Sequence, residues 1–151
     1  MAELDFEHKF FNGFIELLKT HQNYNSALDE SVEYLKNHLP VTNIVILAKV
    51  DNTILFDENS TCLDYLQNNK HIFWRKLSAE NIIIEQYEEK ETSCEIFIVA
   101  FWEPNNEIIA IICKKGQVYP FGSNKLAFFE KLSSVVNILR LLPRKMSSNS
   151  V

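Results

Sequence analysis

The sequence predicts an α+β domain built on a mostly antiparallel sheet of about five strands. The first observation is a pair of unbroken apolar runs, residues 96–102 and 108–113, joined by a short polar segment. A strand half exposed to water alternates between apolar and polar residues, so continuous runs this short indicate strands covered on both faces. The second observation is that apolar residues recur at helical spacing near both ends of the chain, which predicts helices that cover the sheet.

Length and charge limit the class of protein. At 151 residues, of which 46% are hydrophobic, the chain is long enough to bury a core. We expect a single domain over residues 1–143 and a flexible, serine-rich tail over residues 144–151. The net charge of −5 disfavours nucleic acid as a partner, because binding to phosphates needs clustered Lys and Arg.

Cysteine usage and hydropathy indicate the compartment. Cys62, Cys94 and Cys113 are widely spaced and form no CxxC pair. This pattern predicts free thiols in a reducing, cytoplasmic setting rather than a disulfide framework. The acidic first residues lack the features of a secretion signal. No apolar run approaches the roughly 18 residues that span a bilayer, so we expect no membrane partner.

Two helices are expected before the first strand. The first has apolar residues at spacings of three and four, namely Phe6, Phe10, Phe14, Leu17 and Leu18. The second is expected to begin with Asn25 or Ser26 as its cap and to end before Pro40. Its apolar stripe consists of Leu28, Val32, Leu35 and Leu39.

A first hairpin is expected after the second helix. Residues 44–48 are all apolar and predict a central strand. The polar pair at 51–52 is a plausible tight turn, and it leads into a second strand over residues 53–56.

The middle of the chain predicts a crossover followed by a short strand. Residues 61–77 predict one or two short helices with a polar break at 67–69. Residues 82–84 predict a short strand. The acidic, polar segment 87–95 predicts an exposed connection to the two apolar runs.

The last helix is expected to run from Ser123, a good cap residue, to about Leu142, before Pro143 ends it. Its main apolar stripe consists of Phe128, Leu132, Val135, Leu139 and Leu142, and a second face adds Leu126, Phe129 and Val136. One stripe is enough to cover the sheet. The apolar residues beyond that stripe are expected to face another helix, either of this chain or of a second copy.

The order of these elements resembles the GAF domain family over nearly the whole chain. The closest correspondence is a strand at 96–101, a short turn, an aliphatic strand at 108–113, a loop that ends in the aromatic Phe121, and a long final helix. Residues 71–86 also resemble the family's short helix followed by a strand. The resemblance implies terminal helices on one face of the sheet and crossover helices on the other. PAS-like and other α/β sensor folds are the alternatives.

The motifs of ligand-specific and catalytic GAF members are missing. Cyclic-nucleotide-binding relatives often carry Asn-Lys-x-x-x-Phe-x-x-x-Asp/Glu, and Asn124-Lys125 with Phe129 echoes it only inside the expected helix, so we do not transfer it. No cysteine is followed by His, as bilin attachment would require, and the clustered cysteines of the methionine-sulfoxide reductases are absent. We therefore predict a non-catalytic protein, and its cofactor is unknown.

The resemblance implies a small-molecule pocket between one sheet face and the crossover helices. On this chain that position corresponds to Tyr65, Phe73, Trp74 and Arg75. Aromatic walls suit a planar ligand, and a guanidinium can hold an anionic group. The alternative is that Phe73 and Trp74 fill the sheet face and Arg75 is solvated. The four His are isolated in sequence, so no metal site is predicted.

In the resembled family the first and last helices often pair across a two-fold axis, which implies a homodimer. The expected interface residues are Phe10, Phe14, Phe128, Leu132, Val135 and Leu139. The predicted function is a regulatory or sensor module in signalling, with a small molecule and an effector protein as further expected partners. The alternative is an adaptor for a protein partner, with a pocket filled by its own side chains.

Overall fold

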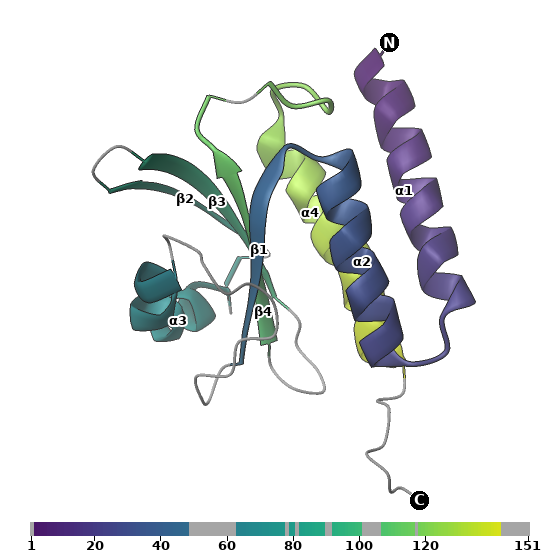
Figure 1. Cartoon of the computed structure of the whole chain (residues 1–151), viewed down its shortest axis with the longest axis horizontal. Helices are drawn as coiled ribbons and strands as arrows, with labels where there is room; N and C mark the ends of the chain where they lie inside the picture. Colours follow the sequence, from purple (N-terminus) through teal and green to yellow (C-terminus); the bar gives the residue numbers. More distant parts are fainter. Residues whose placement is uncertain are drawn as a thin grey trace, which may run out of the picture.

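The computed structural model describes residues 2–48, 63–77, 79–80, 82–89, 92–100, 107–116 and 118–142 (Figure 1). These residues form an α+β fold, as the sequence predicted. The elements in chain order are α1 (Ala2–Thr20), α2 (Tyr24–His38), β1 (Val41–Ala48), α3 (Leu63–Leu77), β2 (Ile82–Glu89), β3 (Thr92–Ala100), β4 (Glu107–Lys114), α4 (Lys125–Val136) and the 3-10 helix η1 (Asn137–Leu141). None of the helices described is both long and apolar enough to cross a membrane.

The four described strands form one antiparallel sheet in the order β1-β4-β3-β2. β3 and β4 pair as the sequence predicted, with Phe97 opposite Ile111. β1 pairs with the other edge of β4, and β2 pairs with the other edge of β3. The strand predicted as central is thus at an edge of the described sheet. The predicted strand at 53–56 lies outside the described residues, so four strands are described rather than five.

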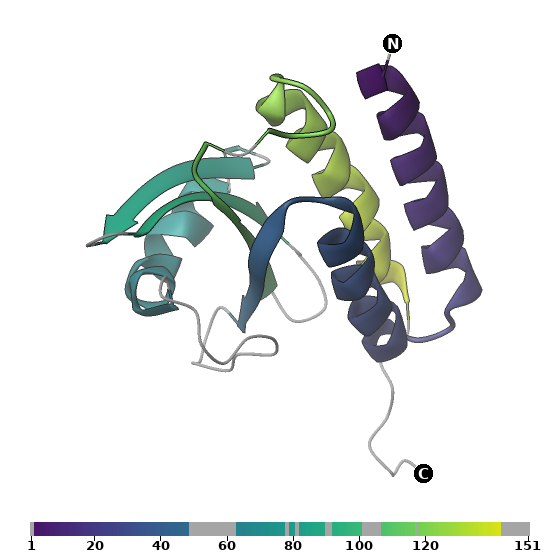
Figure 2. The same ribbon diagram turned by 45° about the horizontal axis from the view of Figure 1, so that its top comes forward.

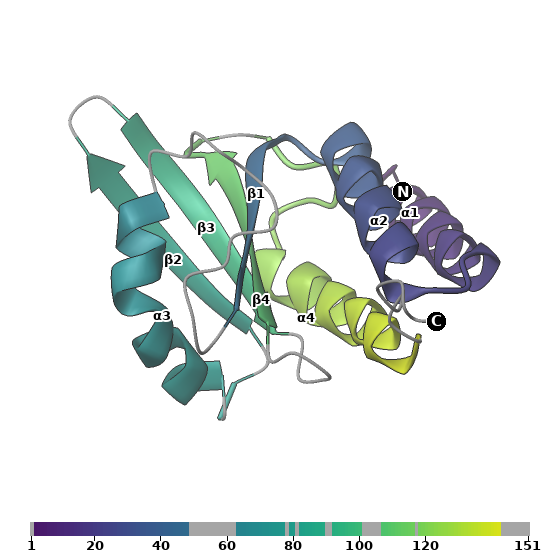
Figure 3. The same ribbon diagram turned by 60° about the horizontal axis from the view of Figure 1, so that its bottom comes forward.

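Helices cover both faces of this sheet (Figures 1 and 3). α2 and α4 pack on one face, and α3 packs on the other. α1 lies outside α2 and α4 and packs against both, which makes it a further layer (Figure 2). The helices from the two ends of the chain therefore lie together on one side of the sheet.

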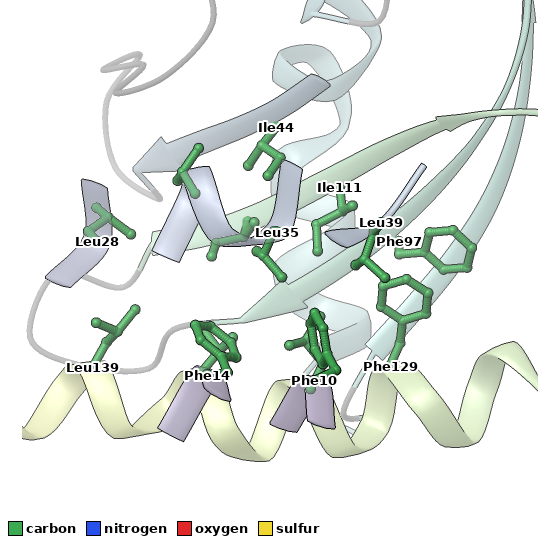
Figure 4. Close-up of a cluster of buried hydrophobic side chains, with 14 of the residues drawn as sticks. Phe10, Phe14, Leu28, Leu35, Leu39, Ile44, Phe97, Ile111, Phe129 and Leu139 are labelled. Carbon is green, nitrogen blue, oxygen red and sulfur yellow. The ribbon is translucent and has the colours of Figure 1, made fainter. Parts of the chain in front are cut away.

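The sheet separates two apolar clusters, because successive residues of a strand point to opposite faces. Phe97 and Ile111 face α2 and α4 and join the larger cluster, part of which Figure 4 shows. Ile96 and Ile112 face α3 and pack in a cluster with Phe73. Burial of both faces explains why these strands read as continuous apolar runs.

Asparagines cap α2 and α4. The side-chain oxygen of Asn23 accepts a hydrogen bond from the backbone nitrogen of Ser26 at 2.9 Å. Asn124 accepts in the same way from the backbone of Ala127 at 3.2 Å. The predicted caps, Asn25 or Ser26 for α2 and Ser123 for α4, are therefore wrong, since neighbouring polar residues have similar capping propensity and the local sequence does not choose between them.

α3 is one continuous helix, so the predicted break at 67–69 is wrong. The amide of Asn69 donates to the carbonyl oxygen of Tyr65, one turn earlier in the same helix, at 2.8 Å. The polar residues belong to the solvent side of an amphipathic helix, whose other side buries Leu66, Phe73 and Leu77.

The predicted exposed connection at 87–95 is also wrong, because most of it belongs to two paired strands. β2 extends to Glu89, and β3 begins at Thr92. The two strands pair along their full described length, with Glu89 opposite Thr92. Strand pairing uses backbone groups that every residue here carries irrespective of side-chain polarity, so composition alone misplaced this hairpin.

α1 packs on part of the apolar surface of α4 that the sheet does not cover. The ring of Phe128 lies 5.4 Å from the ring of Phe10 and 5.2 Å from that of Phe11. Leu132 is fully buried in the same cluster. Of the two alternatives that the sequence left open, a helix of this chain therefore faces α4.

Candidate functional site

Glu95 is a carboxylate buried in the sheet. It lies in β3, opposite Gln86 of β2 and Cys113 of β4. Only 4% of the residue is exposed. Two residues before Phe97 in the same strand, it points to the face that α2 and α4 cover. Because acidic side chains are almost never fully buried unless they are paired, its partners define the candidate site.

Three side chains donate hydrogen bonds to this carboxylate. The hydroxyl of Tyr119 donates to Oε1 at 2.7 Å, and Nε2 of Gln86 donates to Oε2 at 2.8 Å. Nζ of Lys125 donates to Oε2 and forms an ion pair with it. These donors come from β2, from the connection between β4 and α4, and from the first residue of α4. Glu95 therefore ties three separate segments to β3.

The network fixes the protonation of its members. Burial alone raises the pKa of Glu95, but the hydrogen bonds from Lys125, Tyr119 and Gln86, with the charge of Lys125, outweigh burial and hold that pKa below its ordinary value. Burial raises the pKa of Tyr119, and its hydrogen bond to Glu95 raises it further. At neutral pH Glu95 is therefore an anion and Tyr119 is a neutral donor.

Cys113 lies behind Tyr119 and is a protonated thiol. Burial raises the pKa of Cys113 to about 12, although its hydrogen bond with Tyr119 works in the opposite direction. A cysteine reacts as its thiolate, and almost none is present at neutral pH with such a pKa. Cys113 therefore acts as a small apolar side chain that fills space beneath the network.

An open pocket of about 440 Å³ lies over the ion pair. The lining residues are Glu95, Gly116, Val118, Tyr119, Gly122, Ser123 and Lys125. Apart from Glu95 they come from the β4–α4 connection (residues 115–124, of which 117 is outside the described residues) and from the start of α4. Figure 1 shows this connection in light green at the top of the molecule.

Two glycines and two aromatic residues shape the β4–α4 connection. Gly116 and Gly122 both have a φ angle of 88°, a left-handed backbone conformation that favours glycine. The ring of Tyr119 stacks on that of Phe121 at 4.9 Å, and Phe121 stacks on Phe128 of α4 at 4.0 Å. The connection is thus anchored to the helix and to the sheet, whereas Val118 is 89% exposed at the rim of the pocket.

The residues predicted to bind a ligand lie elsewhere, on α3 and across the sheet from this pocket. Phe73 and Trp74 are only 2% and 7% exposed and pack on the sheet. Tyr65 is half-buried, and its hydroxyl donates to Oε1 of Glu85 at 2.8 Å. Arg75 is exposed. These positions match the alternative in which Phe73 and Trp74 fill the sheet face.

The residues predicted to form a dimer interface lie within the core of the single chain. Five of them are at most 1% exposed, namely Phe10, Phe14, Phe128, Leu132 and Leu139. Val135 is partly buried against the same cluster. The broad apolar stripes thus serve the chain's own packing. Homodimer formation stays a prediction, and its interface would have to consist of side chains other than these five.

Sequence reasoning missed Glu95, because its acidic surroundings favoured solvent exposure. Its partner Lys125 lies 30 residues away, and the only motif it echoed, Asn124-Lys125 with Phe129, gave no reason to pair it with Glu95. One signal was available: Glu95 directly precedes an unbroken apolar run and lies in alternation with Phe97. Among the residues that the structure describes, no group of three or more His, Cys, Asp or Glu could hold a metal ion.

Comparisons of the chain with protein-family models, curated proteins and solved structures found no match.

Proposed function

We propose that this chain is a non-catalytic, GAF-like regulatory module that binds a small molecule in the open pocket over Glu95 and Lys125. The observation that carries the proposal is the ion pair: a buried carboxylate and a partly exposed ammonium meet in a pocket of about 440 Å³. Small-molecule sites in proteins have volumes of this order and contain a few convergent polar groups. The proposal moves the ligand away from α3, where Phe73 and Trp74 fill the sheet face.

The protonation states favour binding over catalysis. A general acid or base works best when its pKa lies near the working pH. The pKa of Glu95 lies below its ordinary value, while those of Tyr119 and Cys113 are raised, the latter to about 12. These groups keep their protonation states around neutral pH. They are suited to holding a ligand rather than to transferring protons.

The position of Lys125 supports a regulatory role. It is the first residue of α4, and the same helix packs on both the sheet and α1. The ring of Phe129 stacks on Phe97 of β3 at 3.9 Å, and Phe128 lies against the rings of α1. A ligand that binds Lys125 therefore acts on a helix in contact with both layers. A second copy of the chain or an effector protein would detect the resulting shift at the outer helices.

Native mass spectrometry of the freshly purified protein tests this proposal. We expect a bound mass that is lost on denaturation and is absent from a Lys125→Met variant. The matched control is Lys115→Met, which removes an exposed ion pair with Glu88 and should leave the bound mass unchanged. A ligand retained in Lys125→Met would show that the pocket is not its site. A dimer mass in the same spectrum would support the homodimer.

A protein-partner adaptor is the second candidate function. The filled face beneath α3 favours it, as do two exposed apolar side chains near the start of α4, Val118 and Leu126, which are 89% and 52% exposed. An apo spectrum together with light-induced crosslinking from a benzoyl-phenylalanine at position 118 to a specific cellular protein would favour the adaptor over the small-molecule module.

A further inference from the structure

Within the described part of the chain, three donors reach the carboxylate of Glu95, which leaves one of its acceptor positions unused. Its two oxygens together offer about four acceptor positions. Gln86 and Lys125 both donate to Oε2, whereas Tyr119 alone donates to Oε1. Since Glu95 lines the pocket, a donor group of a ligand can complete the coordination of Oε1 without displacing a protein side chain.

Lys125 offers the complementary group. Its ammonium has three N–H donors, and among the described residues it has one acceptor, Oε2 of Glu95. Its side chain is 35% exposed, and the residue lines the same pocket. The hydroxyl of Ser123, an exposed residue that also lines the pocket, is a further donor beside it. An anionic group of a ligand can therefore meet Lys125 while Lys125 keeps its contact with Glu95.

The charge balance of the site selects between ligands. Glu95 and Lys125 cancel, so the site is neutral before a ligand binds. A ligand with a single charge would leave an uncompensated charge beside a carboxylate that is only 4% exposed, where the protein screens charge less than bulk water does. A ligand with one positive and one negative group keeps the site neutral and places each group next to its opposite charge.

We infer that the ligand of this pocket is a free α-amino acid, with its ammonium at Oε1 of Glu95 and its carboxylate at Nζ of Lys125. The inference rests on the proposed function and specifies the ligand of the same site. The side chain of the amino acid would lie toward Val118, at the apolar rim of the pocket.

Titration calorimetry with the common L-amino acids tests the inference. The best binder is then compared with two analogues that each lack one charged group; for leucine these are 3-methylbutylamine and 4-methylpentanoate. We expect each analogue to bind about tenfold more weakly or worse, because each loses a charge-assisted hydrogen bond. Absence of binding by any L-amino acid at millimolar concentration, or equal binding by an analogue, would overturn the inference.

Variants and chemical shifts locate the ligand. Lys125→Met should weaken binding about tenfold or more, whereas Lys115→Met should leave it unchanged. Amide chemical shifts of the wild-type protein provide a readout that needs no variant. We expect the amino acid to shift Gly116, Gly122 and Lys125, and shifts confined to α3 would contradict the inference. A bound molecule of another class that shifts these three amides would overturn the inference but leave the proposed function standing. A protein that binds nothing would count against both.

Discussion

Gly13 lies where α1 crosses α2, and the hydroxyl of Tyr34 occupies the space that a side chain there would need. A Cβ atom at position 13 would lie 2.5 Å from Oη of Tyr34, closer than real Cβ contacts come. The hydroxyl cannot move freely, because it donates to the carbonyl oxygen of Phe10 at 2.7 Å. The ring of Tyr34 also stacks on His38 at 4.0 Å and on Phe14 at 5.4 Å. We therefore predict that Gly13→Ala destabilises the protein.

The size of this destabilisation follows from three contributions to the free energy of unfolding, one favourable and two unfavourable. Replacing Gly by Ala inside a helix stabilises it by about 1 kcal/mol. Displacing the Tyr34 hydroxyl gives up a hydrogen bond of about 1 kcal/mol, and overpacking of this kind costs about 1–3 kcal/mol. The net loss in free energy of unfolding should be about 1–3 kcal/mol.

Removal of the Tyr34 hydroxyl should reverse the sign of the stability change that Gly13→Ala causes. In a Tyr34→Phe background the nearest ring carbon lies at 3.4 Å, close to ordinary contact. Gly13→Ala should then stabilise the protein by about 0.5–1 kcal/mol, because only the helix propensity remains. Urea denaturation measures each corner of this double-mutant cycle, provided that the m-value stays constant.

Asn12→Ala is the matched control, since Asn12 is an exposed neighbour on α1. It should change stability by no more than about 0.5 kcal/mol. If Gly13→Ala stabilised both backgrounds equally, the close packing of α1 against Tyr34 would be refuted.

Three further predictions concern the site and its support. The folded-state pKa of Glu95 lies below its ordinary value of 4.5, so its contribution to stability is present above that value and is lost as the pH falls through the folded-state pKa. Glu95→Gln should accordingly lower the urea midpoint at neutral pH, and the wild-type and variant curves should converge on acidification. Cys113 has a pKa of about 12, so it should resist iodoacetamide at about pH 8 in the folded protein and react once the protein is unfolded in urea. Peptide mapping would identify the labelled cysteine. Rapid labelling of Cys113 in the native protein would contradict its burial. Phe121→Ala removes the ring stacked on Phe128 and should cost about 3–5 kcal/mol in thermal denaturation, whereas Val118→Ala, at an exposed position, should cost less than about 0.5 kcal/mol.

The helices could be predicted because their signal is local. Phe10 and Phe14 are one turn apart in the sequence, and that spacing puts them on one face of α1 whatever they pack against. The surface on which that face packs could not be predicted from the local sequence. The same apolar face could pack on a second copy of the chain or on α4 of the same chain. Only the contacts of Phe10 and Phe11 with Phe128 show that it packs on α4.

The hairpin of β2 and β3 shows the opposite case. Residues 87–89 look like a polar connection, yet Tyr87 pairs with Cys94 and Glu88 pairs with Ser93. The stabilisation comes from backbone hydrogen bonds between two segments, which neither segment encodes alone. Composition therefore predicted where the apolar parts of the strands lie and missed where the strands begin and end.

By itself the sequence determined the α+β class, the helices and the apolar parts of the four described strands, because periodicity and apolar runs report burial at short range. The tertiary structure alone decided which helix covers α4, which face of the sheet is filled by Phe73 and Trp74, and which carboxylate is buried. The candidate site belongs to this second group. Glu95 is 24 residues from Tyr119 and 30 from Lys125 in the chain, and they meet only because α4 and the β4–α4 connection pack against the sheet.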